Sequence, residues 1–156
     1  MTGSPAVPCI WLTGRRGAGK RTLGALAAAT LTADGRRCAV LGPDDLATHL
    51  RSGPSEEGLA SVAWLANLLT ANGVAVIVTV DTPRRADRAA VAARIAGYVE
   101  ILVDAPPEVC TQRAGRADPA YEEPIAPDHR VPTGDRDERA ATALLVSYLE
   151  DLTDRD

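Results

Sequence analysis

The chain has 156 residues and a formal net charge of −4, and 46% of its residues are hydrophobic and 24% charged. This length and composition predict one globular domain over residues 1–156, with flexible ends at 1–7 and 153–156. Aromatic residues make up only 3% of the chain, and this scarcity together with the acidic balance excludes a generic nucleic-acid binder, which needs basic patches and stacking rings. We expect a cytoplasmic protein without a membrane partner, because the sequence has neither an apolar run of ~20 residues nor a secretion signal, and its cysteines form no C-x-x-C pair.

Strands and helices alternate in the predicted secondary structure. Short apolar segments predict strands at residues 9–13, 37–41, 74–80 and 98–103. Helical spacing of apolar residues and capping signals predict helices at residues 20–33, 44–50, 55–72, 83–95, 106–113 and 135–152. Residues 114–135 lack periodicity and are predicted to form a long loop. This alternation predicts an α/β fold in which a parallel sheet is covered on both faces.

A glycine-rich segment between the first predicted strand and the first predicted helix matches the pattern G-x-x-x-x-G-K, which binds nucleotide phosphates. The segment consists of Gly14, Arg15, Arg16, Gly17, Ala18, Gly19, Lys20, Arg21 and Thr22. Glycines let backbone N–H groups converge on phosphate oxygens, and the N-terminus of the helix adds positive potential. Lys20, the only lysine of the chain, is expected to reach the β- and γ-phosphates. The alternative, a glycine-rich turn with one exposed lysine, is disfavoured because motif and context agree.

The loop departs from this pattern at Arg21, where a Ser or Thr hydroxyl normally binds Mg²⁺. An arginine cannot bind a cation, so Arg21 either places its guanidinium group on the phosphates or points away. Thr22 supplies a hydroxyl one residue later, about 100° round the helix. The sequence therefore predicts a nucleotide site in which dependence on Mg²⁺ is doubtful.

Aspartates follow several of the predicted strands. They are Asp44 and Asp45, Asp81, and Asp104. Ligands of a doubly wound sheet sit at the carboxyl ends of its strands, which makes each aspartate a candidate base or metal contact. The alternative for any one of them is a turn former or a helix cap.

Several stretches together resemble the adenylylsulfate kinase family, whose members use ATP to phosphorylate the 3′-hydroxyl of adenylylsulfate. The matching stretches are residues 10–14, 17–20, 22–23, 41–50, 55–57, 76–83, 85–88, 103–110 and 118–124. The resemblance implies a P-loop NTPase fold of the nucleoside-monophosphate-kinase type, a three-layer sandwich with a mostly parallel five-stranded sheet. It also implies a role in sulfate assimilation, ATP with Mg²⁺ as cofactors, a small hydroxyl-bearing acceptor, and a homodimer, which is usual in the family.

The resemblance implies roles for two residues outside the loop. Asp44 falls on the acidic residue near Mg²⁺ and the accepting hydroxyl, and Thr82 falls on the serine of the family's I-S-P segment. The predicted catalytic residues are Asp44, Lys20 and Asp81, the predicted acceptor contacts are Asp44, Thr82 and Arg84, and the predicted metal contacts are Thr22 and Asp44.

The acceptor side departs from the family pattern. The substrate-side arginine of the family is replaced by Ala47, and its two aromatic residues are replaced by Pro54 and Arg84. A D-R-x-x-N segment is deleted after Glu57, and the lysine- and arginine-rich lid before Asp118 is missing. The ATP-phosphate half of the site is therefore retained, whereas most of the adenylylsulfate pocket is not.

The function predicted from these residues is that of an ATP:hydroxyl phosphotransferase, a small-molecule kinase acting on adenylylsulfate or a related acceptor. The departures leave a second hypothesis open, a catalytically weak or inactive nucleotide-binding pseudo-kinase with a regulatory or partner-binding role. A third hypothesis, a fold remnant that no longer binds nucleotide, is opposed by the retention of Lys20.

Overall fold

The computed structural model describes residues 7–53, 55–135 and 137–155. Its elements, in chain order, are β1 (Cys9–Thr13), α1 (Lys20–Ala33), β2 (Cys38–Leu41), α2 (Pro43–Thr48), α3 (Glu56–Ala71), β3 (Ala75–Val78), α4 (Arg85–Ala92), β4 (Tyr98–Asp104), α5 (Pro107–Ala114), β5 (His129–Pro132) and α6 (Glu138–Thr153). Of the ends predicted to be flexible, residues 1–6 and 156 lie outside the described residues, and Thr153 is the last residue of α6. Across the described ranges, every helix is too short or too polar to cross a bilayer.

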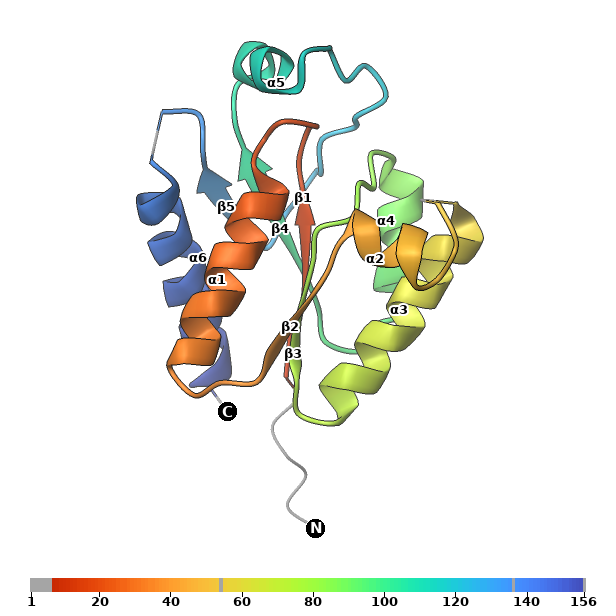
Figure 1. Ribbon diagram of the computed structural model, residues 1–156, viewed down its shortest axis with the longest axis vertical. Coiled ribbons are helices and arrows are strands. Elements are labelled where there is room, and N and C mark those ends of the chain that lie inside the picture. The colour runs from red at the N-terminus through yellow and green to blue at the C-terminus, as the bar shows by residue number, and fades with distance from the viewer. Residues whose placement is uncertain (1–6, 54, 136, 156) are drawn as a thin grey trace.

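The strands form a single parallel sheet in the order β2-β3-β1-β4-β5. β1 lies at its centre, where Ile10 is in register with Ile77 of β3 and with Val99 of β4. Figure 1 shows α1 and α6 on one face of the sheet and α2, α3 and α4 on the other, while α5 lies beyond the carboxyl ends of the strands. The predicted α/β class, three-layer architecture and five-stranded parallel sheet are confirmed.

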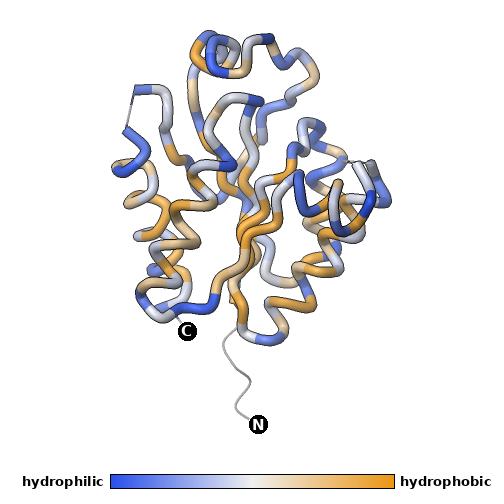
Figure 2. Tube along the Cα trace, viewed as in Figure 1, coloured by the Kyte–Doolittle hydropathy of each residue, from blue (hydrophilic) through white to orange (hydrophobic). Residues whose placement is uncertain are grey.

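The core is divided into two apolar layers by the sheet. Alternate residues of β1 enter different layers: Ile10 and Leu12 pack towards α1 and α6, and Cys9 and Trp11 pack towards α3. Because both faces are covered, this central strand reads as a continuous apolar run. Figure 2 accordingly shows the hydrophobic residues concentrated along the central strands.

The largest error of the sequence prediction is the missed strand β5, which lies inside the predicted loop 114–135. Of its four residues only Val131 is buried, and Pro132 ends it, so the segment carries no strand periodicity. Pairing with β4 brings Val131 opposite Val103 and supplies the hydrogen bonds that define the strand. Such a short edge strand depends on its neighbour, and this is why the local pattern did not reveal it.

Other predicted boundaries shift by a few residues. The helix predicted at 83–95 is the shorter α4, which begins after Arg84 and ends before Ala93. The strand predicted at 74–80 ends at Val78. The last helix begins at Glu138, because the Asp137 side chain accepts a hydrogen bond from the N–H of Ala140 at 2.7 Å and caps it.

Candidate functional site

The predicted phosphate loop joins the carboxyl end of β1 to α1. Gly14, Gly17 and Gly19 have φ values of 155°, 86° and 101°. A Cβ at Gly17 would lie 2.4 Å from the carbonyl oxygen of Cys110, so a larger residue cannot enter without moving the backbone. The first turn of α1 contains no acidic residue, and its N-cap residue Gly19 has no side chain that could cap the helix. The first backbone N–H groups of α1 therefore remain available to an anion. The loop therefore has the backbone conformation and the free donors of a phosphate site.

Lys20 lies in this loop with 6% of its surface exposed. Its ammonium group donates hydrogen bonds to the carbonyl oxygens of Gly14 at 2.7 Å and Arg15 at 3.1 Å. It also lies 3.1 Å from Oδ1 of Asp81, which follows β3. A buried ammonium needs such partners, and together they hold the charge beside the loop N–H groups. The structure thus brings together Lys20 and Asp81, two of the predicted catalytic residues.

The two aspartates that follow β2 have different roles. The carboxylate of Asp45 accepts a hydrogen bond from the N–H of Gly42 at 2.7 Å and caps α2. Asp44 is exposed, and its carboxylate pairs with the guanidinium group of Arg21 in the first turn of α1. Asp44 therefore lies beside the phosphate loop, and its part as base or metal contact stays a prediction, whereas Asp45 has the local capping role that was the alternative interpretation.

The predicted acceptor contacts Thr82 and Arg84 are both engaged by the protein itself. The hydroxyl of Thr82 is buried, accepts a hydrogen bond from the indole Nε1 of Trp11 at 3.1 Å and donates to the carbonyl of Val80 at 3.1 Å. Arg84 is exposed and pairs with Asp87 one turn later in α4, with Nε 2.9 Å from Oδ2. Neither side chain lies in contact with Asp44 among the described hydrogen bonds and ion pairs.

A cavity of about 230 Å³ lies beside the phosphate loop. It is lined by Ala18, Gly19, Thr22, Leu23, Arg113, Thr133, Glu138 and Ala141. Thr133 donates a hydrogen bond to the carbonyl of Ala18 at 2.7 Å, and Arg113 donates to the carbonyl of Thr133 at 3.0 Å. Sequence reasoning missed both residues, because they lie far from the loop in sequence and match no motif. The cavity gives the phosphate site a concave neighbour of the kind that holds the rest of a ligand.

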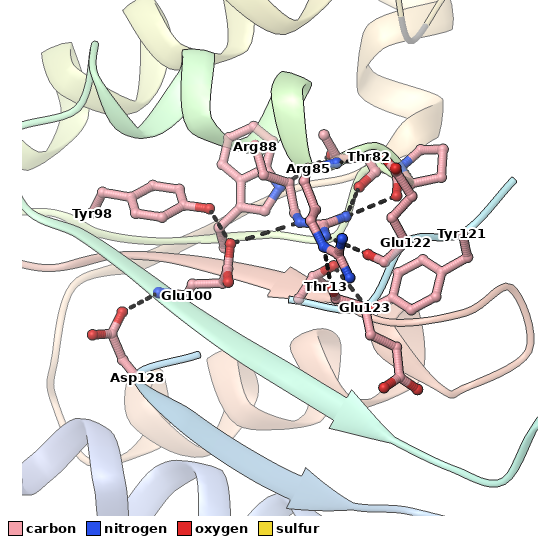
Figure 3. Close-up of polar contacts among 12 residues, drawn as sticks. Thr13, Thr82, Arg85, Arg88, Tyr98, Glu100, Tyr121, Glu122, Glu123 and Asp128 are labelled. Carbon is pink, nitrogen blue, oxygen red and sulfur yellow. Dashed lines mark hydrogen bonds and ion pairs between the residues drawn. The ribbon is translucent and has the colours of Figure 1, made fainter. Parts of the chain in front are cut away.

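A polar network also missed by sequence reasoning holds residues 121–123 against the carboxyl end of β1 (Figure 3). The hydroxyl groups of Tyr121 and Thr13 lie 3.3 Å apart. The N–H of Glu122 donates to the carbonyl of Pro83 at 2.8 Å, and the Glu122 carboxylate accepts from the N–H of Arg85 at 2.9 Å. These contacts join a long connection to the start of α4.

Arg88 is the buried centre of this network, with 2% of its surface exposed. Its guanidinium group donates to the carbonyls of Thr82 at 2.7 Å and Pro83 at 2.9 Å, and also to the carbonyl of Glu122. Its Nε lies 3.7 Å from a carboxylate oxygen of Glu100 on β4. One side chain thus fixes two separate connections at the carboxyl edge of the sheet.

The tyrosines beside Arg88 keep their phenol protons. Burial raises the pKa of Tyr98, and the neighbouring Glu100 carboxylate raises it further. Burial likewise raises the pKa of Tyr121, opposed by its hydrogen bond with Thr13. The Tyr98 hydroxyl donates to Glu100 at 3.1 Å, which satisfies a carboxylate that also faces Arg88.

The residues present do not form the usual magnesium site of a phosphate loop. Position 21 carries a guanidinium group in place of a hydroxyl, and this group pairs with Asp44, the predicted metal contact. Thr22, the other predicted metal contact, lines the cavity on the side of Ala18 and Gly19. Within the described ranges no three His, Cys, Asp or Glu side chains gather as a metal cluster.

A parallel sheet with a lysine-bearing, glycine-rich loop after its central strand defines a P-loop kinase fold. A model of the family described as adenylylsulphate kinase matches residues 6–123, and the chain belongs to this family. The adenylyl-sulfate kinase of Chloroflexus aurantiacus is 32% identical over 147 residues, which cover 80% of this chain and 78% of that protein. That of Synechococcus sp. (strain JA-2-3B'a(2-13)) is 39% identical over 110 residues, 67% of this chain.

Solved structures agree with this assignment. The APS kinase of Mycobacterium tuberculosis, in complex with AMPPNP and APS, superposes with a TM-score of 0.82 at 26% identity and covers 94% of this chain and 99% of that one. The match spans only 63% of the length of the Synechococcus relative. These matches place the fold of this chain among the adenylylsulfate kinases.

Proposed function

We propose that this protein binds ATP at the Gly14–Thr22 loop and transfers the γ-phosphoryl group to a hydroxyl of a small acceptor. The observation that carries the proposal is the position of Lys20, buried in a glycine-rich loop between a central strand and a helix N-terminus. A buried ammonium beside converging N–H groups stabilises phosphate charge, and phosphoryl transfer depends on positioning and charge neutralisation more than on covalent chemistry by the protein. Family membership supports the same reaction class.

The loop and two aspartates outside it have separate parts in this reaction. The backbone N–H groups of the loop hold the phosphates, and Lys20 neutralises charge on the β- and γ-phosphates. The acceptor oxygen attacks the γ-phosphorus, the bond to the bridging oxygen of ADP breaks, and the acceptor proton passes to the carboxylate of Asp44. Asp44 suits this role because it is exposed beside the first turn of α1. Asp81 keeps the Lys20 ammonium group in place.

Adenylylsulfate is the first acceptor to test. A relative with the same fold was solved with APS bound, and the curated relatives carry the name adenylyl-sulfate kinase. Against this, Ala47 is a helix residue of α2 without a charge, and Arg84 is paired with Asp87. Each missing charged hydrogen bond removes roughly 1.5–3 kcal/mol of binding free energy before compensation. We therefore expect adenylylsulfate to bind more weakly here than in family members that have the complete pocket.

The test is phosphoryl transfer from γ-labelled ATP to adenylylsulfate, with formation of the phosphorylated product as the readout. Asp44→Asn should lower the transfer rate by about 10²–10⁴-fold, the contribution of a general base, while ATP affinity changes little. Asp151→Asn, an exposed acidic position on α6, is the matched control and should behave as the unmodified protein. An unchanged rate of phosphoryl transfer in Asp44→Asn would mean that Asp44 is not the general base.

A second candidate function is nucleotide binding without transfer. The observation that favours it is the Arg21–Asp44 ion pair, which engages the proposed base with the residue that replaces the metal-binding hydroxyl. Tight binding of ATP with no transfer to any hydroxyl acceptor would support this second function.

A further inference from the structure

The side chain of Thr133 holds one peptide group of the phosphate loop, although the two are 115 residues apart in the sequence. Its hydroxyl donates a hydrogen bond to the carbonyl oxygen of Ala18 at 2.7 Å. Ala18 is 0% exposed and Thr133 is 8% exposed, so water does not compete for this bond. The carbonyl of Ala18 is therefore fixed in one direction, towards the residue that follows β5.

The fixed carbonyl of Ala18 also fixes the N–H group that follows it. A peptide group is planar, and in a trans peptide its C=O and N–H bonds point to opposite sides. The described residues have no cis peptide bond, so the peptide between Ala18 and Gly19 is trans. The N–H of Gly19 consequently points away from Thr133, and the Thr133 hydroxyl determines its direction.

The N–H of Gly19 is a free donor at the position where this loop type binds phosphate. It has no acceptor among the residues that the structure describes, whereas the N–H of Arg16 donates to the Asp118 carboxylate at 2.9 Å. Gly19 is the N-cap of α1, directly precedes Lys20 and lines the cavity beside the loop. A free donor at the start of this helix, next to the lysine of the motif, is suited to a phosphate oxygen.

The backbone of Thr133 is itself held on both sides. Its N–H donates to the carbonyl of Asp104 at 2.8 Å and extends the pairing of β5 with β4. Its carbonyl accepts a hydrogen bond from the guanidinium group of Arg113 at 3.0 Å. A side chain on so constrained a backbone keeps its hydroxyl in one place, which is what a residue needs in order to position another group.

We propose that Thr133 is a positioning residue for phosphate binding: by holding the Ala18 carbonyl, it keeps the N–H of Gly19 directed at a phosphate oxygen of the nucleotide. This inference rests on the proposed function and adds a residue that acts through the loop without touching the phosphates. Without the hydroxyl, the buried carbonyl of Ala18 loses its donor, which favours rotation of the peptide. The affinity for phosphate should then fall, whereas the affinity for the nucleoside part should not.

Thr133→Val is the decisive variant, because it removes the hydroxyl and keeps the branched shape of the side chain. Thr133→Ser is its counterpart, because it keeps the hydroxyl and removes the methyl group. Thr142→Val is the matched control: Thr142 is also 8% exposed and its hydroxyl also donates to a carbonyl at 2.7 Å, that of Glu138, but this bond lies within α6.

The experiment measures dissociation constants for ATP, pyrophosphate and adenosine by calorimetry in the full chain and the three variants. We expect Thr133→Val to weaken ATP and pyrophosphate by the same factor, about 5- to 50-fold, up to the loss of one hydrogen bond to a charged group, and to leave adenosine unchanged. Thr133→Ser should restore most of the affinity because it returns the hydroxyl. Thr142→Val should behave as the unmodified protein.

Nuclear magnetic resonance of the isotope-labelled chain gives a second measurement, which does not depend on the stability of Thr133→Val. The amide proton of Gly19 should shift downfield when pyrophosphate binds to the unmodified protein and to Thr133→Ser, because a hydrogen bond to an anionic oxygen deshields the proton. Pyrophosphate binding without this shift would mean that the Gly19 N–H does not meet the phosphate, and the inference would be wrong.

The possible results separate this inference from the proposed function. If the unmodified protein binds ATP and pyrophosphate and Thr133→Val binds them equally well, the inference alone is wrong. A loss limited to ATP would also overturn it, because unchanged pyrophosphate binding indicates that Thr133 contacts the nucleoside part. The same holds for a loss that Thr133→Ser does not restore or that Thr142→Val reproduces. Failure of all four proteins to bind ATP and pyrophosphate would overturn the proposed function, and the inference with it.

Discussion

The ammonium group of Lys20 lies 3.1 Å from a carboxylate oxygen of Asp81, which follows β3 at the carboxyl edge of the sheet. The only lysine of the chain is thus held by an acid from a distant segment. An ammonium group fixed by a carboxylate and two carbonyls loses little conformational entropy when a phosphate arrives. The Lys20 ammonium group must, however, then interact with both the Asp81 carboxylate and the bound phosphate.

Lys20→Ala should weaken ATP binding by roughly 1.5–3 kcal/mol, which is about 10- to 150-fold in the dissociation constant. The physical reason is the loss of a charge-assisted contact with the phosphates, in a site where Asp81 then keeps only its longer contact with Arg16. Titration calorimetry measures the effect. Arg139→Ala, which removes an exposed cation from α6, is the control for net charge and should change the constant little. Equal affinity in the Lys20→Ala and Arg139→Ala variants would remove the phosphate loop assignment.

Arg88→Leu should lower the free energy of unfolding by about 3–5 kcal/mol, because it removes the cation at the centre of a buried polar network. The carbonyls of Thr82 and Glu122 lose their donor, the carbonyl of Pro83 keeps only the N–H of Glu122, and the carboxylate of Glu100 keeps only the hydroxyl of Tyr98. Urea unfolding followed by circular dichroism gives the measurement. Arg84→Ala is the control from the same end of α4, and its exposed pair with Asp87 predicts a loss of at most about 1 kcal/mol.

The contrast between Lys20 and Arg88 shows what the sequence could predict. The loop around Lys20 is local in sequence, and a motif with known chemistry predicted both its conformation and its position between the first strand and the first helix. Arg88 lies in a run of charged residues that is typical of a solvated helix face, yet it is buried. Its partners Glu100 and Glu122 come from distant segments, so only the folded chain brings them together.

The same distinction applies to β5 and to Thr133. Both lie in a connection that has no periodicity, and both owe their positions to neighbours, β4 in one case and the Ala18 carbonyl in the other. Asp118, in the same connection, matched the family resemblance, but its contact with the loop N–H was not predictable from spacing. Pro54, which replaces an aromatic residue of the family pattern, lies outside the described residues.

The buried thiol of Cys9 makes the stability of the protein depend on pH in the alkaline range. Its thiol is 0% exposed, and desolvation by burial raises its pKa from the ordinary value of 9.0 to about 12. Between these values the folded chain keeps a proton that the unfolded chain releases. The stabilisation is therefore complete below pH 9.0 and is lost as the pH rises towards about 12.

Cys9→Ala should accordingly flatten the fall of the unfolding free energy between pH 9.0 and about 12. The largest slope that one such group can contribute is about 1.4 kcal/mol per pH unit. The quantity to compare is the slope from urea unfolding at several pH values, since the cavity left by the mutation shifts the whole curve. Cys38→Ala should flatten the slope over a narrower range, because burial raises the pKa of that half-buried thiol only to about 11. Identical slopes in the unmodified protein and Cys9→Ala would contradict the raised pKa.

The last prediction concerns Arg21, which stands where a hydroxyl normally holds Mg²⁺ between the β- and γ-phosphates. Its guanidinium group can neutralise phosphate charge directly, and it repels a divalent ion by an energy on the order of kilocalories at the dielectric of a protein surface. The guanidinium group pairs with Asp44 beside the first turn of α1, close to the phosphate loop. We therefore expect ATP affinity in the unmodified protein to depend less on Mg²⁺ than is usual for this loop.

Arg21→Ser tests this expectation, because it restores the usual hydroxyl and frees Asp44 at the same time. The ATP dissociation constant is measured with Mg²⁺ and with a chelator in both proteins. The ratio of the two constants should be near one in the unmodified protein and should rise by about tenfold or more in Arg21→Ser, which corresponds to at least about 1.4 kcal/mol of restored metal contribution. Arg36→Ser, which removes a cation at the opposite end of α1 beside Asp154, controls for charge and should leave the ratio unchanged. A strong Mg²⁺ requirement in the unmodified protein that Arg21→Ser does not alter would mean that the metal is held by other ligands and that Arg21 takes no part in phosphate binding.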